Sequence, residues 1–191
     1  MSNYAWGLPQ SVTVNGKSYA INADAQKIEY ILEIYQNAEY TQDERHLVCL
    51  RVFYKDFDNI PTDDYAAALI AAFEFIDGGK TKTEDSKTNR PALVRWEQDL
   101  PLIISTINTM LGRDIRNESL HWWTFLGYFQ NIPAESFFAT IIDIRQKLKS
   151  GKLKDKAERE FYRKNKDIID IKKQYTEDEK RIMAEWGIKT G

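Results

Sequence analysis

Residues 117–129 constrain the fold more than any other stretch, because five aromatic rings and one of the two histidines fall within nine consecutive residues. On a helix, Trp122, Phe125 and Phe129 share one apolar face at the i, i+3, i+7 spacing. His121 lies on a second stripe beside that face, so little of the helix surface is left for solvent. We therefore expect this helix to lie in the middle of the fold, contacted on most sides by other elements.

Residues 11–21 predict a β-hairpin. Apolar residues alternate on both sides of Asn15-Gly16, a pair that tolerates the positive φ angles required at both turn positions. The alternative is a solvent-exposed loop. Because an isolated hairpin is marginally stable in water, it should pack on the helical body or pair with a strand of another subunit in a homo-oligomer.

The rest of the chain is typical of helices, and we predict six or seven of them in one mainly α, bundle-like domain that carries the short N-terminal hairpin. Asn22 is the expected cap of the first helix, and a capping box at Thr41 begins the second. Gly112 fits the left-handed position that ends a helix. We divide the chain into a helical domain, 1–150, and a charged helical C-terminal segment, 151–191.

The charge balance changes sign along the chain. Residues 145–191 hold 15 Lys or Arg and 9 Asp or Glu, whereas the preceding residues hold 12 and 20. A basic segment on an acidic body is one footprint of nucleic-acid binding. Both signs alternate at helical spacing in this segment, however, as on a solvated helix face with i,i+4 ion pairs. We favour the solvated face.

The single cysteine, Cys49, excludes an internal disulfide and fits a reducing compartment. The N-terminal residues do not resemble a signal segment, and no apolar run approaches the roughly 18 residues that a membrane span needs. We therefore expect no membrane association and a cytoplasmic location.

The sequence offers little chemistry. His46 and Cys49 are spaced i, i+3 and could form a nucleophilic pair, but Cys49 lies in an apolar run, where a free cysteine packs as a small hydrophobic residue. His121 among tryptophans reads as a base, as a ligand, or as a buried imidazole held by a hydrogen bond. One cysteine and two histidines in this arrangement do not make a zinc site, and no glycine-rich phosphate loop is present. We expect a non-enzymatic protein without metal or cofactor.

The motif His121-Trp122-Trp123, with Phe125 following, resembles the signature of a small tailed-phage family encoded just ahead of the tail tape measure protein. Four further segments are similar to that family in the same order: Leu8-Pro9, residues 14–22, Glu97-Gln98-Asp99 and Phe161-Tyr162-Arg163-Lys164. The resemblance implies a tail assembly chaperone of a siphophage or prophage, in the cytoplasm of the bacterial host. Such a protein coats the long, apolar, helical tape measure protein and helps to deliver tail tube subunits.

Two alternatives stay open. The chain could be a structural tail or connector component retained in the virion, or a nucleic-acid-binding module that uses residues 147–181. The candidate partner-binding residues form two groups. The first lines a groove unless its helix is core: Trp122, Phe125 and Phe129. The second forms a docking face unless the segment packs on its own body: Phe161, Tyr162, Ile168, Ile169 and Trp186.

Overall fold

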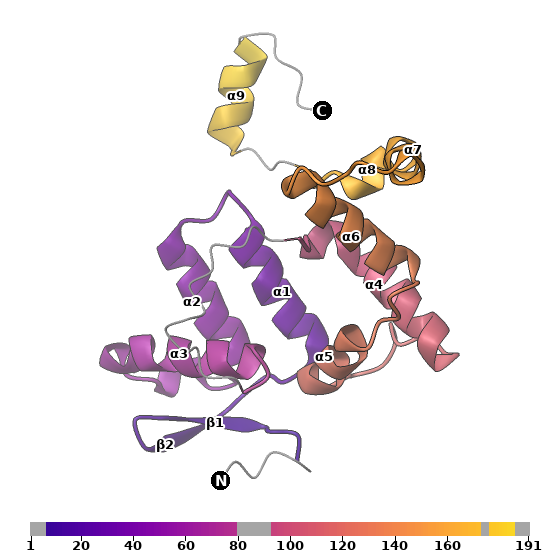
Figure 1. Cartoon of the computed structure of the whole chain (residues 1–191). Helices are drawn as coiled ribbons and strands as arrows, with labels where there is room; N and C mark the ends of the chain where they lie inside the picture. The colour runs from indigo at the N-terminus through magenta and orange to yellow at the C-terminus, as the bar shows by residue number, and fades with distance from the viewer. Residues whose placement is uncertain (1–6, 80–92, 173–175, 186–191) are drawn as a thin grey trace.

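The computed structural model describes residues 7–79, 93–172 and 176–185 (Figure 1). The chain is mainly helical with an N-terminal antiparallel hairpin, which confirms the predicted fold class. No helix in these residues is long and apolar enough to cross a membrane. The α-helices are α1 (Ala25–Gln36), α2 (Gln42–Phe53), α3 (Tyr65–Ile76), α4 (Trp96–Leu111), α5 (Trp122–Gln130), α6 (Phe137–Lys149), α7 (Lys156–Lys164), α8 (Lys166–Ile169) and α9 (Glu177–Glu185). Short 3-10 helices span Phe57–Asn59 and Thr62–Asp64.

The hairpin consists of β1 (Ser11–Val14) and β2 (Lys17–Ala20), paired from Ser11 opposite Ala20 to Val14 opposite Lys17. Asn15 and Gly16 have φ angles of 47° and 82°, as the predicted turn requires. The hairpin packs on α3 of the same chain, with Val14 buried in the main core. The Asn15 amide also donates a hydrogen bond to the Asp64 carboxylate, 2.7 Å away. The helical body thus supports a hairpin that would be marginal alone.

The aromatic helix α5 begins inside the core. Trp122 is 1% exposed, and its indole N–H donates to the Ile76 carbonyl at 2.8 Å. Its ring stacks on that of Phe125, which is also buried, with the centroids 5.5 Å apart. The indole of Trp96, from α4, lies 6.1 Å from that of Trp122. The central position predicted for this helix is therefore confirmed for its first turn, whereas Phe129 in the last turn is half-buried.

The cap of α1 differs from our prediction. Asp24, not Asn22, occupies the cap position and accepts a hydrogen bond from the Gln26 backbone N–H at 2.9 Å. Asn22 instead donates its side-chain amide to the Val52 carbonyl at 2.7 Å. The reason is tertiary, since the preceding Ile21 forms an isolated β-bridge with Tyr54 and holds this part of the chain extended.

The half-buried Glu29 of α1 makes the stability of the fold depend on pH. Burial, and then the charge of Glu33, raise the pKa of Glu29 from 4.5 to about 7. The folded state therefore binds more protons than the unfolded state between these values, so stability falls as pH rises through this window. Glu29→Gln should remove this slope and raise the free energy of unfolding at pH 8 by about 1 kcal/mol, a value reduced for solvent screening.

Urea unfolding at pH 5 and pH 8 measures this effect. Glu135→Gln, at an exposed position after α5, is the matched control and should keep the slope of the original protein. An unchanged slope in Glu29→Gln would contradict the assignment.

Candidate protein-binding surface

Two buried charges join the body of the protein to its C-terminal segment. Asp99 on α4 is fully buried, and Arg145 on α6 is 3% exposed. The guanidinium donates to both carboxylate oxygens, from Nη1 to Oδ2 at 2.6 Å and from Nη2 to Oδ1 at 2.9 Å. A bidentate pair of this kind is among the stronger protein hydrogen-bond arrangements. It also has a high desolvation cost, which is offset only if the remaining donors and acceptors are satisfied.

Those donors are satisfied by main-chain carbonyls. Nε of Arg145 donates to Ile169 at 2.6 Å, Nη2 to Ile168 at 2.9 Å and Nη1 to Leu93 at 2.8 Å. Together with the two bonds to Asp99, all five guanidinium N–H groups have acceptors. Two of these acceptors belong to the end of α8, so the buried pair holds the C-terminal segment against α4 and α6.

Gln98, the neighbour of Asp99, binds the same segment. Its amide nitrogen donates to the carbonyls of Ile168 at 2.9 Å and Asp170 at 3.0 Å, and its oxygen accepts from the Lys172 N–H at 3.1 Å. We call Gln98, Asp99 and Arg145 the clamp. Sequence analysis had noted Asp99 only within the Glu97-Gln98-Asp99 segment, and the pairing with Arg145 was missed.

The predicted partner-binding residues differ in how far they are buried. Ile169 is fully buried against Ile141 and Ile144, and Phe161 and Tyr162 pack against that cluster while half-buried. Ile168 is 38% exposed. Thus four of the five tail candidates lie together on α7 and α8, and the fifth, Trp186, lies outside the described residues. The other group belongs to the main core or its edge: Trp122, Phe125 and Phe129.

Exposed apolar side chains remain around the clamped segment. Phe137 at the start of α6 is 43% exposed and contacts the Phe161 ring edge-on at a centroid distance of 5.9 Å. Leu148 near the end of α6 is 36% exposed. We call the following five residues on α6–α8 the C-terminal surface: Phe137, Leu148, Phe161, Tyr162 and Ile168. Apolar side chains exposed on neighbouring elements are a feature of surfaces that bind other proteins.

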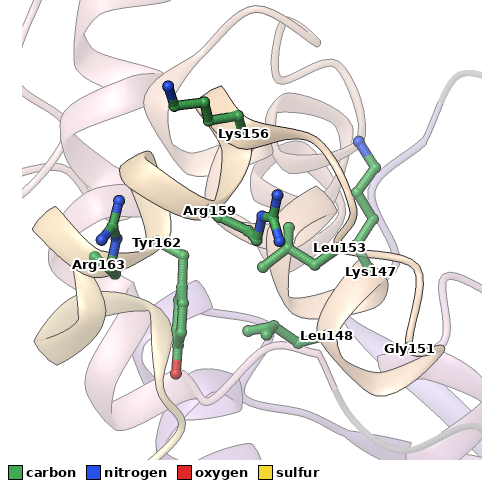
Figure 2. A pocket seen from close by; sticks show the side chains of 8 residues that line it. All are labelled: Lys147, Leu148, Gly151, Leu153, Lys156, Arg159, Tyr162 and Arg163. Carbon is green, nitrogen blue, oxygen red and sulfur yellow. The ribbon is translucent and has the colours of Figure 1, made fainter.

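A groove of about 630 Å³ lies beside this surface, around the end of α6, the following loop and α7 (Figure 2). Its apolar lining comes from Leu148, Leu153 and Tyr162. Four basic side chains complete it: Lys147, Lys156, Arg159 and Arg163. We call it the basic groove. It combines the apolar floor and the polar rim that are typical of sites for amphipathic segments.

The ammonium group of Lys147 is already paired within the chain. It lies 2.6 Å from carboxylate oxygens of both Asp143 and Glu158, and these hydrogen bonds raise the pKa of Lys147 above its usual range. This network links α6 to α7 and so helps to shape the groove. Among the described residues, no carboxylate lies within ion-pair distance of Lys156, Arg159 or Arg163, although the charge of Arg159 helps to lower the pKa of Asp155.

The histidines have structural partners. His121 caps α5, where its Nδ1 accepts from the Trp123 N–H at 3.1 Å and its Nε2 lies 2.9 Å from the Pro9 carbonyl oxygen. With Nδ1 as acceptor, Nε2 is the donor, so both ring nitrogens are occupied. Nε2 of His46 lies 2.7 Å from the Gln42 amide. Within the described ranges, no cluster of three or more His, Cys, Asp or Glu residues is arranged to hold a metal ion.

Cys49 is predicted to be unreactive in the folded protein. Its side chain is fully buried, and burial raises the pKa of the thiol from 9.0 to about 12, although the neighbouring Tyr35 hydroxyl opposes this shift. Since the thiolate is the reactive form, an aromatic disulfide reagent at pH 8 should modify native protein at least about a hundredfold more slowly than protein in guanidinium chloride. Equal rates in the two solutions would show that the thiol is accessible.

Comparison with known families identifies the chain. The family model described as Bacteriophage Gp15 protein matches residues 7–171. The match therefore spans the hairpin, the body, the clamp and the clamped segment, and ends close to the last contact of Gln98 at Lys172. No curated protein and no solved structure matches the chain. Because the family model covers most of the sequence, the chain belongs to the bacteriophage Gp15 protein family.

Proposed function

We propose that this protein is a tail assembly chaperone that binds the phage tape measure protein in the cytoplasm of the bacterial host and helps to recruit tail tube subunits. Membership of a bacteriophage family supports a role in the particle or in its assembly. The C-terminal surface carries the proposal, because α6–α8 expose Phe137, Leu148 and Ile168 and the clamp holds the end of α8 against α6.

A long apolar helical partner needs a surface that covers its apolar side chains while the complex stays in water. Aromatic side chains suit this task, since each buries a large area at a low conformational-entropy cost. Phe137, at the start of α6, and Phe161, on α7, pack edge-on, so a partner helix bound there would contact both rings. The clamp fixes the backbone at Ile168, so binding does not have to order that part of the surface.

A non-enzymatic role is part of the proposal. It is supported by what the potentially reactive groups do in the fold. His121 uses both nitrogens in hydrogen bonds to the main chain, and the thiol of Cys49 is buried with a raised pKa. Neither group meets the geometric requirements of a nucleophile or base that a substrate could reach.

Co-expression with the tape measure protein of the same phage tests the proposal. The original chain should keep the tape measure protein in the soluble fraction. Phe137→Asp combined with Ile168→Asp should lower its soluble amount about tenfold, equivalent to about 1.4 kcal/mol of binding, because two charges replace exposed apolar contacts. Ile70→Asp is the matched control, since Ile70 on α3 is 62% exposed and lies away from α6–α8. This control should behave like the original chain.

Two outcomes would contradict the proposal. One is a tape measure protein that stays insoluble with the original chain, and the other is an equal loss with Ile70→Asp and with the double variant. Thermal unfolding of each purified variant tests whether the substitutions leave its fold intact. A structural tail or connector component, the main alternative, would be found at stoichiometric amounts in purified particles, whereas a chaperone should be absent from them.

A further inference from the structure

Helix α9 has acidic and apolar side chains that complement the basic groove in charge and hydrophobicity, but it does not occupy the groove. A capping box begins it, in which the Thr176 N–H donates to Glu179 at 2.8 Å and the Glu179 N–H donates to the Thr176 hydroxyl at 3.2 Å. Its first turn holds three acids, Glu177, Asp178 and Glu179, and the carboxylate of Asp178 forms an exposed ion pair with Arg181 at 2.8 Å. One turn later, Ile182 is 48% exposed. Figure 1 shows α9 projecting from the body, and neither described apolar cluster includes any of its residues.

The groove presents the opposite charges around an apolar floor. Arg159 and Arg163 are one helical turn apart on α7, and Lys156 belongs to the first turn of the same helix. Leu148, near the end of α6, and Leu153, in the loop between α6 and α7, also line the groove (Figure 2). An amphipathic helix with an acidic first turn followed by an apolar side chain matches this arrangement in both charge and hydrophobicity.

We propose that the basic groove binds α9 of a second copy of this chain. The acidic first turn of α9 lies against Arg159 and Arg163, and Ile182 enters the apolar floor. Since α9 projects from the body of its own chain (Figure 1), we place the contact between two copies. A reciprocal exchange of α9 between two copies satisfies both grooves with twofold symmetry. The groove shares Leu148 and Tyr162 with the C-terminal surface, whereas Phe137 and Ile168, which are substituted to test the tape measure proposal, do not line it.

The lining favours a peptide over a nucleic acid. Sites for single-stranded nucleic acids alternate basic residues with several exposed aromatic rings on which bases stack. The basic groove has one aromatic ring, Tyr162, and the hydroxyl of that side chain is committed to Asp170 at 3.0 Å. Its other apolar side chains are leucines, which pack against aliphatic side chains rather than stack on bases.

Size-exclusion chromatography with light scattering on the full chain tests this contact. Over roughly 1 to 100 µM protein, the mass should rise from one copy to two in low salt, and the rise should shift to higher concentration in about 0.5 M salt. Arg159→Glu with Arg163→Glu should weaken association at least about tenfold, and so should Glu177→Lys with Asp178→Lys. Both α9 substitutions leave the Thr176–Glu179 capping box in place.

Combining the four substitutions in one chain restores opposite charges and should restore the dimer. Lys27→Glu with Lys55→Glu is the control, because it changes the net charge by the same amount at exposed positions away from α6 and α7. A chain that stays monomeric at every concentration would overturn the proposal, as would a dimer that ignores both charge reversals. Binding of a labelled single-stranded oligonucleotide that is lost in Arg159→Glu, with the chain monomeric throughout, would assign the groove to nucleic acid instead.

Discussion

Asp99→Ala is expected to lower the free energy of unfolding by about 3–5 kcal/mol, which is a large share of the stability of a domain this size. The substitution leaves the guanidinium of Arg145 buried, at 3% exposure, without its carboxylate partner. It also removes an acceptor for the Arg95 N–H, which donates to Asp99 at 2.8 Å. Because Arg145 holds the carbonyls of Ile168 and Ile169, the end of α8 should separate from the body before the rest of the chain unfolds.

Urea unfolding gives the loss in stability, and hydrogen exchange at residues 166–172 gives the release of the segment. Glu160→Ala is the matched control, because its ion pair with Lys164 is exposed and should contribute less than about 1 kcal/mol. Asp99→Leu with Arg145→Met removes both charges and should recover much of the loss. If Asp99→Ala and Glu160→Ala cost the same, the clamp does not hold the segment.

Trp122→Ala is expected to cost about 3–5 kcal/mol, because it deletes the largest of the fully buried side chains and leaves a cavity between α5, α3 and α4. The loss includes the hydrogen bond from the indole to the Ile76 carbonyl, which would be left buried without this partner. The effect should appear in the isolated protein, since the chain itself covers this ring.

Thermal unfolding of the isolated variant measures this effect. Phe137→Ala is the control, since Phe137 is 43% exposed and its removal should cost less than about 1 kcal/mol. A Trp122→Ala variant that keeps its unfolding temperature but loses binding to the tape measure protein would place this ring in a binding groove instead of the core.

Turns and helix ends were predicted well where the residues that determine them lie within a few positions of one another. Asn15-Gly16 adopts the positive φ angles of the predicted turn, and the capping box at Thr41 has both of its hydrogen bonds. Gly112 has a φ angle of 66° at the end of α4, as predicted. In each case backbone geometry selects the residue directly, with no contribution from distant parts of the chain.

The clamp could not be predicted in this way. Asp99 and Arg145 are 46 residues apart, and each looks like an ordinary charge on a helix. Only the packing of α4 on α6 buries them together. The predicted cap of α1 was wrong for the same reason, since the bridge between Ile21 and Tyr54 holds Asn22 out of the cap position. Tertiary contacts of this kind override the local conformational preference of a residue, and the neighbouring sequence does not indicate them.

The tail candidates were predicted in part. The sparse apolar residues at Phe161, Tyr162 and Ile168 do gather on α7 and α8, and Ile169 anchors them by burial. The sequence could not show which of these candidates are exposed and which are buried, because their burial depends on α6 and on hydrogen bonds from Gln98 and Arg145. Phe137 was not among the candidates, and its 43% exposure makes it part of the C-terminal surface.

The most direct measurement is the mass, by light scattering after size exclusion, of this chain co-expressed with the tape measure protein of the same phage. We expect one soluble complex in which many copies of this chain accompany each tape measure chain, and a tape measure protein that precipitates when expressed alone. Separate elution of the two proteins, or a tape measure protein that needs no partner to stay in solution, would contradict it.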